Sequence, residues 1–240
     1  MNASEIKTLL NDFFTPLTEI IFKHNGTIDK YVGDMVMAFW GAPLDDPEHR
    51  SNAVKAALEM LEKVEELQPE FDSRGYPEVR IGCGINTGMM NVGDMGSTYR
   101  RSYTVLGDAV NLGSRLEGLT KFYGIRLLVG EETANKLDGF VLRLIDKVKV
   151  KGKHEAIECY EPVCPEETAG EQIKSRVKRY HEALDLYHDQ QWDEAEEILK
   201  DMLEKEPNCL LYQVYLDRIE TLRDVDLPAD WDGAFTHTSK

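Results

Sequence analysis

A strand-like run that stops at a glycine and passes directly into a helix, between Tyr103 and Arg115, constrains the fold of this chain more than any other segment. It reads Y-T-V-L-G-D-A-V-N-L-G-S-R, and its Gly107-Asp108 pair is a turn signal in which Asp108 is predicted as the helix N-cap. Asn111 and Arg115 lie four residues apart, so they project from one face of the predicted helix. An amide beside a guanidinium, close to a helix N-terminus, suits an anionic ligand that carries hydroxyl groups. An exposed amphipathic helix that binds nothing is the alternative interpretation.

Two further segments have patterns that matter for function. Residues 26–41, G-T-I-D-K-Y-V-G-D-M-V-M-A-F-W-G, predict two short strands joined at Gly33-Asp34 as a tight hairpin. A carboxylate at a hairpin tip can present a metal ligand on a rigid support, although most such aspartates only form the turn. Asp34 is therefore a candidate metal ligand. Residues 148–153, V-K-V-K-G-K, alternate apolar and basic side chains, which is ordinarily the pattern of a solvated edge strand.

Taken together and in this order, the three segments resemble the catalytic domain of the class III nucleotidyl cyclases, the adenylate and guanylate cyclases. The resemblance covers about residues 1–163. It is strongest to the bacterial adenylate cyclases that couple a sensory CHASE2 region to this domain. The ending P-A-D-W-D-G-A-F, residues 228–235, is similar to the tails of that group.

The resemblance implies a role for each motif residue. Asp34 resembles a ligand of Mg²⁺ or Mn²⁺. Asn111 resembles the residue that orients the ribose, and Arg115 resembles the one that stabilises charge at the α-phosphate. Lys151, more than Lys153, resembles the contact to the terminal phosphate. In this family the metal carboxylates and the Asn/Arg pair come from opposite subunits, so a head-to-tail homodimer is implied.

Two residues fall where the family reads the base, and their chemistry favours ATP over GTP. Lys30 has an ammonium that only donates, which suits the N1 acceptor of adenine and opposes the N1–H of guanine. Thr104 can accept a hydrogen bond from the adenine 6-amino group through its hydroxyl oxygen. Guanylate cyclases place an acidic residue where Lys30 stands.

One part of the family pattern is missing from this sequence. The family's first strand carries an F-x-D-I-x-G-F-T type motif with a second metal-binding aspartate, and no such motif occurs here. We therefore expect an N-terminally truncated domain that forms little or no cyclic AMP as it stands. We also expect residues 34–40 to have an unpaired neighbour position in the sheet, which favours aggregation or strand exchange.

Composition and charge limit the function classes. The chain has a formal net charge of −16, and residues 166–240 contribute −10 of it, which disfavours nucleic-acid binding. No apolar run approaches the roughly 20 residues that a membrane helix needs. The four cysteines form no metal-binding or disulfide pattern, which favours the reducing cytoplasm.

The predicted fold class is α+β: a ferredoxin-like cyclase sandwich without its first strand, followed by a small helical tail. Helices are predicted at about 3–24 and 48–67, and a strand at 79–87 precedes a glycine-rich turn at 88–96. Leu112, Leu116 and Leu119 should pack inward. A final strand pair is predicted at about 140–150 and 155–162. The domains are predicted as 1–163 (cyclase), 164–170 (linker) and 171–240 (tail).

The tail contains a pattern similar to one tetratricopeptide repeat, between Ala183 and Pro207. An ordinary amphipathic helical hairpin is the alternative. A single repeat cannot bury its own apolar face, so we expect it to dock on a following helix, at about Leu210–Arg223, or on the cyclase core.

The sequence thus predicts an adenylate cyclase domain that converts ATP to cyclic AMP and pyrophosphate in intracellular signalling. Its expected partners are ATP and a second copy of the chain, with an unidentified protein partner for the tail. The alternatives are an inactive cyclase fragment that binds nucleotide or dimerises, and a protein-interaction module led by the tail.

Overall fold

The computed structural model describes residues 1–149, 156–228 and 231–236. The helices are α1 (Ala3–Lys23), α2 (His49–Ser73), α3 (Asp108–Tyr123), α4 (Glu131–Ala134), α5 (Glu171–His188), α6 (Trp192–Lys205) and α7 (Leu210–Leu222). The strands are β1 (Thr27–Val32), β2 (Met35–Phe39), β3 (Cys83–Ile85), β4 (Asn91–Gly96), β5 (Arg101–Leu106), β6 (Leu127–Gly130), β7 (Phe140–Lys149), β8 (Ile157–Pro165) and β9 (Phe235–Thr236).

The described strands form one five-stranded sheet and two separate hairpins. The five-stranded sheet has the order β3-β6-β8-β7-β9, with parallel pairing at both of its ends and antiparallel pairing between β6, β8 and β7. The hairpins β1–β2 and β4–β5 pair only internally within the described chain. Each strand of β1–β2 therefore keeps one unpaired edge, which agrees with the neighbour position that we expect to be empty. The mixed α+β fold is as predicted.

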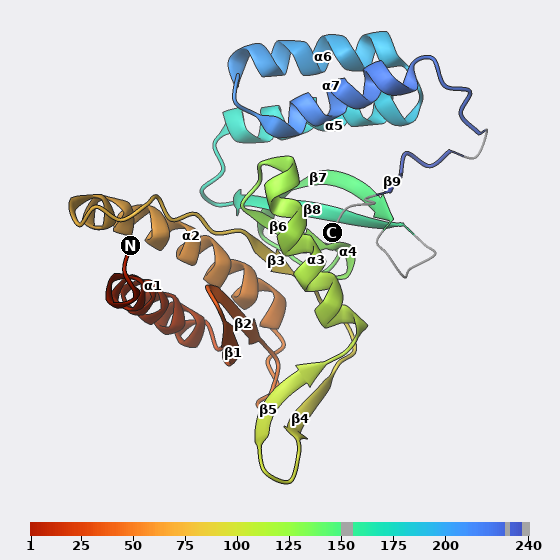
Figure 1. Ribbon diagram of the computed structural model, residues 1–240. Coiled ribbons are helices and arrows are strands. Elements are labelled where there is room, and N and C mark those ends of the chain that lie inside the picture. The colour runs from red at the N-terminus through yellow and green to blue at the C-terminus, as the bar shows by residue number, and fades with distance from the viewer. Residues whose placement is uncertain (150–155, 229–230, 237–240) are drawn as a thin grey trace.

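Helices α1 and α2 lie together beside the β1–β2 hairpin, and β4–β5 projects from the body as a narrow arm (Figure 1). Helix α1 begins with a capping box, in which Asn2 accepts from the Glu5 amide and Glu5 accepts from the Asn2 amide. Helix α2 continues past its predicted end at residue 67 to Ser73. The reason is Phe71, which is fully buried against α1 and makes the extra turn favourable despite Pro69.

The tail helices lie against the sheet rather than apart from it (Figure 1). One apolar core contains buried residues of α3 and the loop after it, of β6, β7 and β8, and of all three tail helices: Leu112, Leu116, Tyr123, Ile125, Leu128, Ile145, Val148, Cys159, Tyr180, Ala183, Leu184, Tyr187, Ala195, Ile198, Leu199, Met202, Leu211, Tyr212, Tyr215 and Ile219. The predicted docking of the tail occurs on both candidates at once, because α6 packs with α7 and α5 packs with strand β7 of the sheet. The likeness to a tetratricopeptide repeat stays a prediction.

Three local predictions were wrong. The strand expected at 79–87 is paired only at Cys83–Ile85. At its N-terminal end, the Gln68 side chain forms hydrogen bonds with both the amide and the carbonyl of Val79, so these groups do not pair with another strand. The glycine-rich turn expected at 88–96 is largely strand β4, whose backbone pairs with β5 from Asn91 to Gly96. Asp108 is the first residue of α3 rather than its cap, a position where its carboxylate still faces the positive end of the helix dipole.

Candidate functional site

The structure brings the two predicted base-reading residues together. Lys30 lies on β1 and Thr104 on β5, 74 residues apart in the chain, and the Lys30 Nζ donates a hydrogen bond to the Thr104 Oγ1 at 3.3 Å. Thr104 is buried, whereas the Lys30 side chain is 46% exposed. A fixed hydroxyl therefore lies beneath an accessible ammonium, at the contact between two hairpins.

A third residue, Asp29, joins this pair, and no sequence pattern indicates it. Its fully buried carboxylate accepts a hydrogen bond from the Thr104 Oγ1 at 2.6 Å and one from the Val105 amide at 3.3 Å. The Lys30 Nζ also lies 3.2 Å from the Asp29 Oδ1, although no hydrogen bond of good geometry reaches that oxygen within the described residues. We describe this contact as an ion pair without a directed hydrogen bond.

A β-bulge explains how two consecutive residues reach the same threonine. Successive side chains of a regular strand point to alternate faces of the sheet, so residues 29 and 30 would point to opposite faces. In the β1–β2 pairing, Ile28 lies opposite Ala38 and Lys30 lies opposite Met37, which leaves Asp29 as the extra residue. Such a bulge bends the strand and redirects side chains. Here it turns both charged groups toward β5.

The other predicted pair, Asn111 and Arg115, lies on α3. Both side chains are exposed, and neither makes a hydrogen bond or ion pair with the part of the chain that the structure describes. Their helix is held by Leu112 and Leu116, which are buried as predicted, and by close approach of its backbone to β3. A Cβ on Gly84 would lie 2.2 Å from the Glu117 amide nitrogen, so this approach requires glycine.

The predicted metal and phosphate contacts have less support. Asp34 is exposed at the tip of the β1–β2 hairpin, where Gly33 adopts a φ of 62°. No group of three metal-binding side chains occurs among the described residues. Because a catalytic metal pair needs two carboxylates and Asp34 supplies one, the described residues do not form a complete metal site on their own. Lys151 and Lys153 lie outside the described residues.

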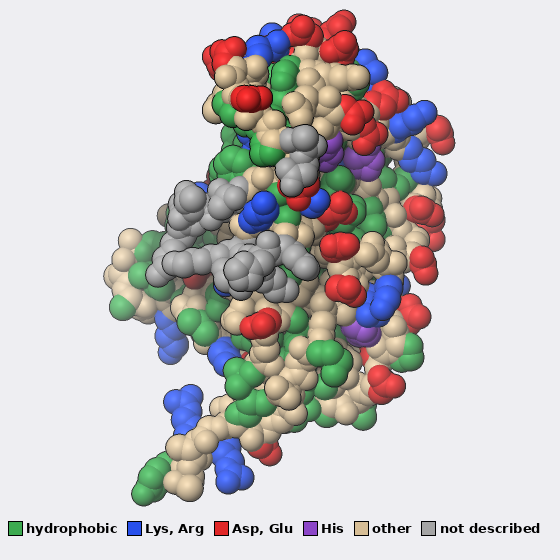
Figure 2. All heavy atoms as spheres, turned by 90° about the vertical axis from the view of Figure 1, so that its right-hand side faces the viewer, with side chains coloured by type: hydrophobic (Ala, Val, Ile, Leu, Met, Phe, Trp, Pro, Cys, Tyr) green, Lys and Arg blue, Asp and Glu red, His purple; other side chains and the backbone are tan. Residues whose placement is uncertain are grey.

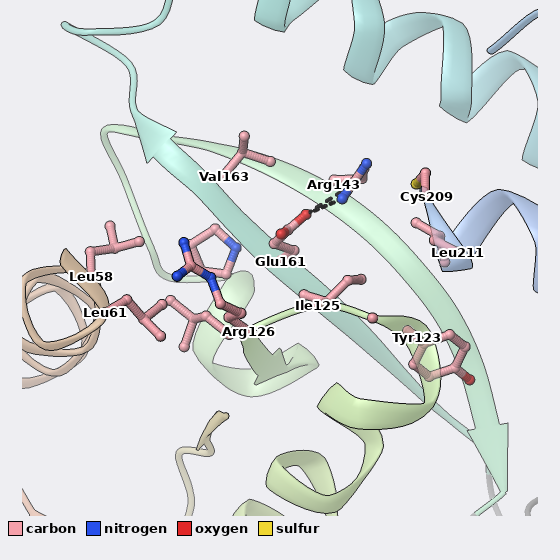
Figure 3. Close-up of a pocket in the computed structure, with 13 residues that line it drawn as sticks. Leu58, Leu61, Tyr123, Ile125, Arg126, Arg143, Glu161, Val163, Cys209 and Leu211 are labelled. Atoms are coloured by element: carbon pink, nitrogen blue, oxygen red, sulfur yellow. Dashed lines mark hydrogen bonds and ion pairs between the residues drawn. The ribbon is translucent and has the colours of Figure 1, made fainter. Parts of the chain in front are cut away.

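A cavity of about 200 Å³ lies elsewhere, between α2, the loop after α3, the β7–β8 pair and the start of α7. Figure 3 shows the ion pair of Arg143 and Glu161, which face each other on the adjacent strands β7 and β8 and line the cavity, with the Arg143 Nε 2.8 Å from the Glu161 Oε2. The guanidinium is thus already neutralised by a carboxylate. None of the predicted site residues lines this cavity, and we do not assign the nucleotide to it.

A buried polar cluster connects the tail to the sheet and to α3. Asp146 on β7 accepts from the Arg218 Nη2 at 2.7 Å, from the Tyr215 hydroxyl at 3.2 Å and from the Tyr123 hydroxyl. Asp146 is 1% exposed and Arg218 is 6% exposed. Burial raises the pKa of the Tyr215 hydroxyl well above its ordinary value, so this group remains a donor at neutral pH. Tyr123 is the last residue of α3, the helix that carries Asn111 and Arg115.

The arm and the tail differ in surface charge. Basic side chains gather on the narrow projection that β4 and β5 form, and acidic ones are frequent over the tail (Figure 2). Arg100 and Arg101 are exposed at the turn of the arm. No described helix is long and apolar enough to cross a bilayer.

Comparison with known proteins identifies relatives for most of the chain. Residues 1–161 match the family described as the adenylate and guanylate cyclase catalytic domain. Adenylate cyclase 1 of Rhizobium meliloti is 38% identical over 163 residues, which is 68% of this chain and 24% of that protein. The adenylate cyclase of Anabaena cylindrica is 41% identical over 169 residues, which is 67% of this chain and 33% of that protein. The chain therefore spans about a quarter to a third of the length of these relatives.

Solved structures agree with the fold. The adenylyl cyclase CyaB from P. aeruginosa superposes with a TM-score of 0.63 at 31% identity, covering 71% of this chain and 88% of that one. One relative also extends over the tail: the terminal-differentiation specific adenylate cyclase of Dictyostelium discoideum is 33% identical over 234 residues, which is 95% of this chain and 11% of that protein.

Proposed function

Because the chain belongs to the adenylate and guanylate cyclase catalytic-domain family, we propose that it binds ATP and forms 3′,5′-cyclic AMP and pyrophosphate. One observation carries the choice of base: the Lys30 ammonium lies 3.3 Å from the Thr104 hydroxyl in a single accessible site. This pair offers a donor to N1 of a purine and an acceptor to a group at position 6. Adenine presents an acceptor and a donor there, and guanine presents the reverse.

The chemistry of cyclisation indicates a role for each of the remaining site residues. The ribose 3′-oxygen attacks the α-phosphorus and loses its proton to solvent, and the bond to pyrophosphate breaks. Asn111 would hold the ribose, and Arg115 would stabilise negative charge on the α-phosphate as the bond forms. A lysine of residues 151–153 would contact the terminal phosphate. Asp34 would be one ligand of Mg²⁺ or Mn²⁺, and the described residues do not complete the site of this metal.

A second copy of the chain is the proposed partner. Asn111 and Arg115 are exposed on α3 and have no partner within the described chain, as expected for side chains that act in the site of another subunit. Large apolar side chains are also exposed on the two hairpins, namely Tyr31, Val32, Met35, Val92, Tyr99, Tyr103 and Leu106. Exposed apolar groups gathered on neighbouring elements are typical of an interface. We propose a head-to-tail homodimer.

Mixing two variants tests this arrangement. Asp34→Ala and Arg115→Ala should each be inactive alone if the metal carboxylate and the Asn/Arg pair of one site come from opposite subunits. In a mixed dimer, one of the two sites contains neither substitution. Random assortment should therefore restore about a quarter of the parent activity in any form of the chain that turns over ATP. Failure of the mixture to exceed either variant alone would contradict a site shared between subunits.

A nucleotide-binding module without turnover is the second candidate, and one observation favours it. Asp34 is the one predicted metal carboxylate, and β1–β2 keeps unpaired edges within the described residues. Equilibrium dialysis with ATP and GTP tests the site itself, and a cyclic AMP assay with Mg²⁺ or Mn²⁺ distinguishes the enzyme from the module. Binding of ATP over GTP without cyclic AMP would select the module. Absence of ATP binding would contradict both functions.

We propose a cytoplasmic location from the state of the cysteines. All four, Cys83, Cys159, Cys164 and Cys209, are free thiols, which persist in a reducing compartment. Burial raises the pKa of the Cys83 thiol to about 12, so this group stays protonated and unreactive.

A further inference from the structure

We propose that Asp29 is a positioning residue that determines base specificity by fixing the direction of the Thr104 hydroxyl. This inference rests on the proposed function, because it concerns how the nucleotide base is chosen. Asp29 would be a third residue that contributes to base selection, beside Lys30 and Thr104, and it would limit the hydrogen bonds that Thr104 can make. With Asp29 in place, Thr104 can only accept a hydrogen bond from a ligand.

The cluster of Asp29, Lys30 and Thr104 contains few hydrogen atoms that can be donated, and each can be assigned. An ionised carboxylate accepts and does not donate, and a threonine hydroxyl has one hydrogen and two lone pairs. The Thr104 hydroxyl donates its one hydrogen to the Asp29 Oδ2 at 2.6 Å. The Lys30 Nζ, at 3.3 Å, occupies one lone pair of the Thr104 oxygen. One lone pair remains for a ligand, and no hydrogen does.

Rotation of the hydroxyl is opposed by the burial of its partner. The Asp29 side chain is 0% exposed, and Thr104 is 7% exposed. If the hydroxyl turned to donate to a ligand, the Asp29 Oδ2 would keep only the Val105 amide, at 3.3 Å, and water could not replace the lost donor. A buried acceptor that loses its partner is costly. Thr104 is therefore held as an acceptor before any base arrives.

The fixed direction selects between purines. The 6-amino group of adenine donates to the remaining lone pair of Thr104, while the 6-carbonyl of guanine would face that lone pair with its own. Lys30 supplies the second criterion at N1. Its ammonium bonds to Thr104 through one N–H and forms an ion pair with the Asp29 Oδ1 at 3.2 Å, so an N–H group remains for the ligand. Asp29 thus orients both readers.

Three variants separate this role from a structural one. Asp29→Ala frees the Thr104 hydroxyl, which could then donate to guanine. Asp29→Asn is the matched control: its amide oxygen can accept from both Thr104 and Val105, and the Val105 N–H disfavours the flipped orientation. Thr104→Val removes the hydroxyl through which Asp29 acts.

The measurement is the ratio of the dissociation constants for ATP and GTP, by equilibrium dialysis with the 240-residue chain. Circular dichroism melting confirms that each variant folds. We expect Asp29→Ala to reduce the preference for ATP by about tenfold, and Asp29→Asn to retain most of it. In the Thr104→Val background, Asp29→Ala should not change the ratio further, because the two residues act as one unit.

A merely structural aspartate would weaken both nucleotides equally and leave the ratio unchanged. That result, in a wild type that prefers ATP, would overturn the role of Asp29 and leave the proposed function intact. An effect of Asp29→Ala that persists in full in the Thr104→Val background would also overturn it. A wild type that binds neither nucleotide, or both equally, would contradict the proposed function and the inference together.

Discussion

At the scale of single residues, the charge of Lys30 is held in place by the buried carboxylate of Asp29. Reversing that charge should have a specific effect. Lys30→Glu would place a second carboxylate beside Asp29 and remove the donor to N1. Two mismatched polar contacts cost roughly 1–3 kcal/mol each, so the original preference for ATP should be about two to four powers of ten. Lys30→Glu should abolish most of it.

The check is the ATP-to-GTP ratio of kcat/KM in a form of the chain that turns over nucleotide, or of affinities otherwise. Arg115→Ala should weaken both nucleotides alike, because it acts at phosphate. Lys7→Glu makes the same charge reversal on an exposed part of α1 and should leave the ratio unchanged. If Lys30→Glu also leaves it unchanged, Lys30 does not read the base.

The sequence predicted Lys30 and Thr104 but could not predict Asp29, and the reason is geometric. Strand alternation assigns neighbouring residues to opposite faces. The bulge that places Asp29 and Lys30 together depends on how β1 pairs with β2 and meets β5, and neither contact is local in the sequence. Asn111 and Arg115 were predictable because helical spacing is a local property.

At the scale of elements, helix α5 is attached to strand β7 by a histidine that must be neutral. The Leu144 amide donates to the His181 Nε2 at 3.0 Å. Burial lowers the pKa of His181 and Arg143 acts in the same direction, although Asp185 opposes them. The unfolded chain therefore binds a proton at His181 more readily than the folded chain does. Stability should fall as the pH falls from about 7.5 through the ordinary histidine pKa of about 6.5.

Urea unfolding at about pH 7.5 and 5.5 measures this effect. In His181→Gln, the amide oxygen can still accept from Leu144 but does not titrate in this range. The variant should lose less stability on acidification than the wild type does. Some dependence should remain, since burial also lowers the pKa of His188 and His49. Equal losses in both proteins would show that His181 is not a source of the pH dependence.

Helix periods predicted the elements of this chain better than strand patterns did. Apolar residues at helical spacing predicted α1 and α2, with small errors in the positions of their ends. The strand before β4 was predicted too long, because the sequence does not show that Gln68 bonds to the Val79 backbone. Strand limits depend on distant partners, whereas helix bonds are formed within one segment.

At the scale of the whole molecule, the ion pair of Asp146 and Arg218 joins β7 to the tail. Removing one partner leaves a buried charge without compensation, so Arg218→Met should cost about 3–5 kcal/mol of unfolding free energy. Adding Asp146→Asn should recover much of that loss, because the double variant buries no isolated charge. Urea unfolding of both single variants and the double variant measures the coupling. Additive losses would contradict a direct pair.

The apolar core that the sheet and the tail share leads to a second prediction for the whole molecule. The buried residues Ile145 and Val148 on β7 lie in one core with Tyr180 and Tyr215 of the tail. We expect sheet and tail to unfold in one transition, with coincident melting curves by near- and far-ultraviolet circular dichroism. Deletion of residues 171–240 should expose this apolar face and cause aggregation. A soluble, cooperatively melting deletion variant would show that the tail is a separate unit.

The pair of Asp146 and Arg218 also has a consequence for descent. The two residues are 72 positions apart, yet neither charge is tolerable in the core without the other. They should be inherited together. A relative that lacks helix α7 should have an uncharged residue at the position of Asp146, or another buried cation beside it. A relative that aligns through the tail, as the Dictyostelium protein does over 95% of the chain, should retain or lose both charges.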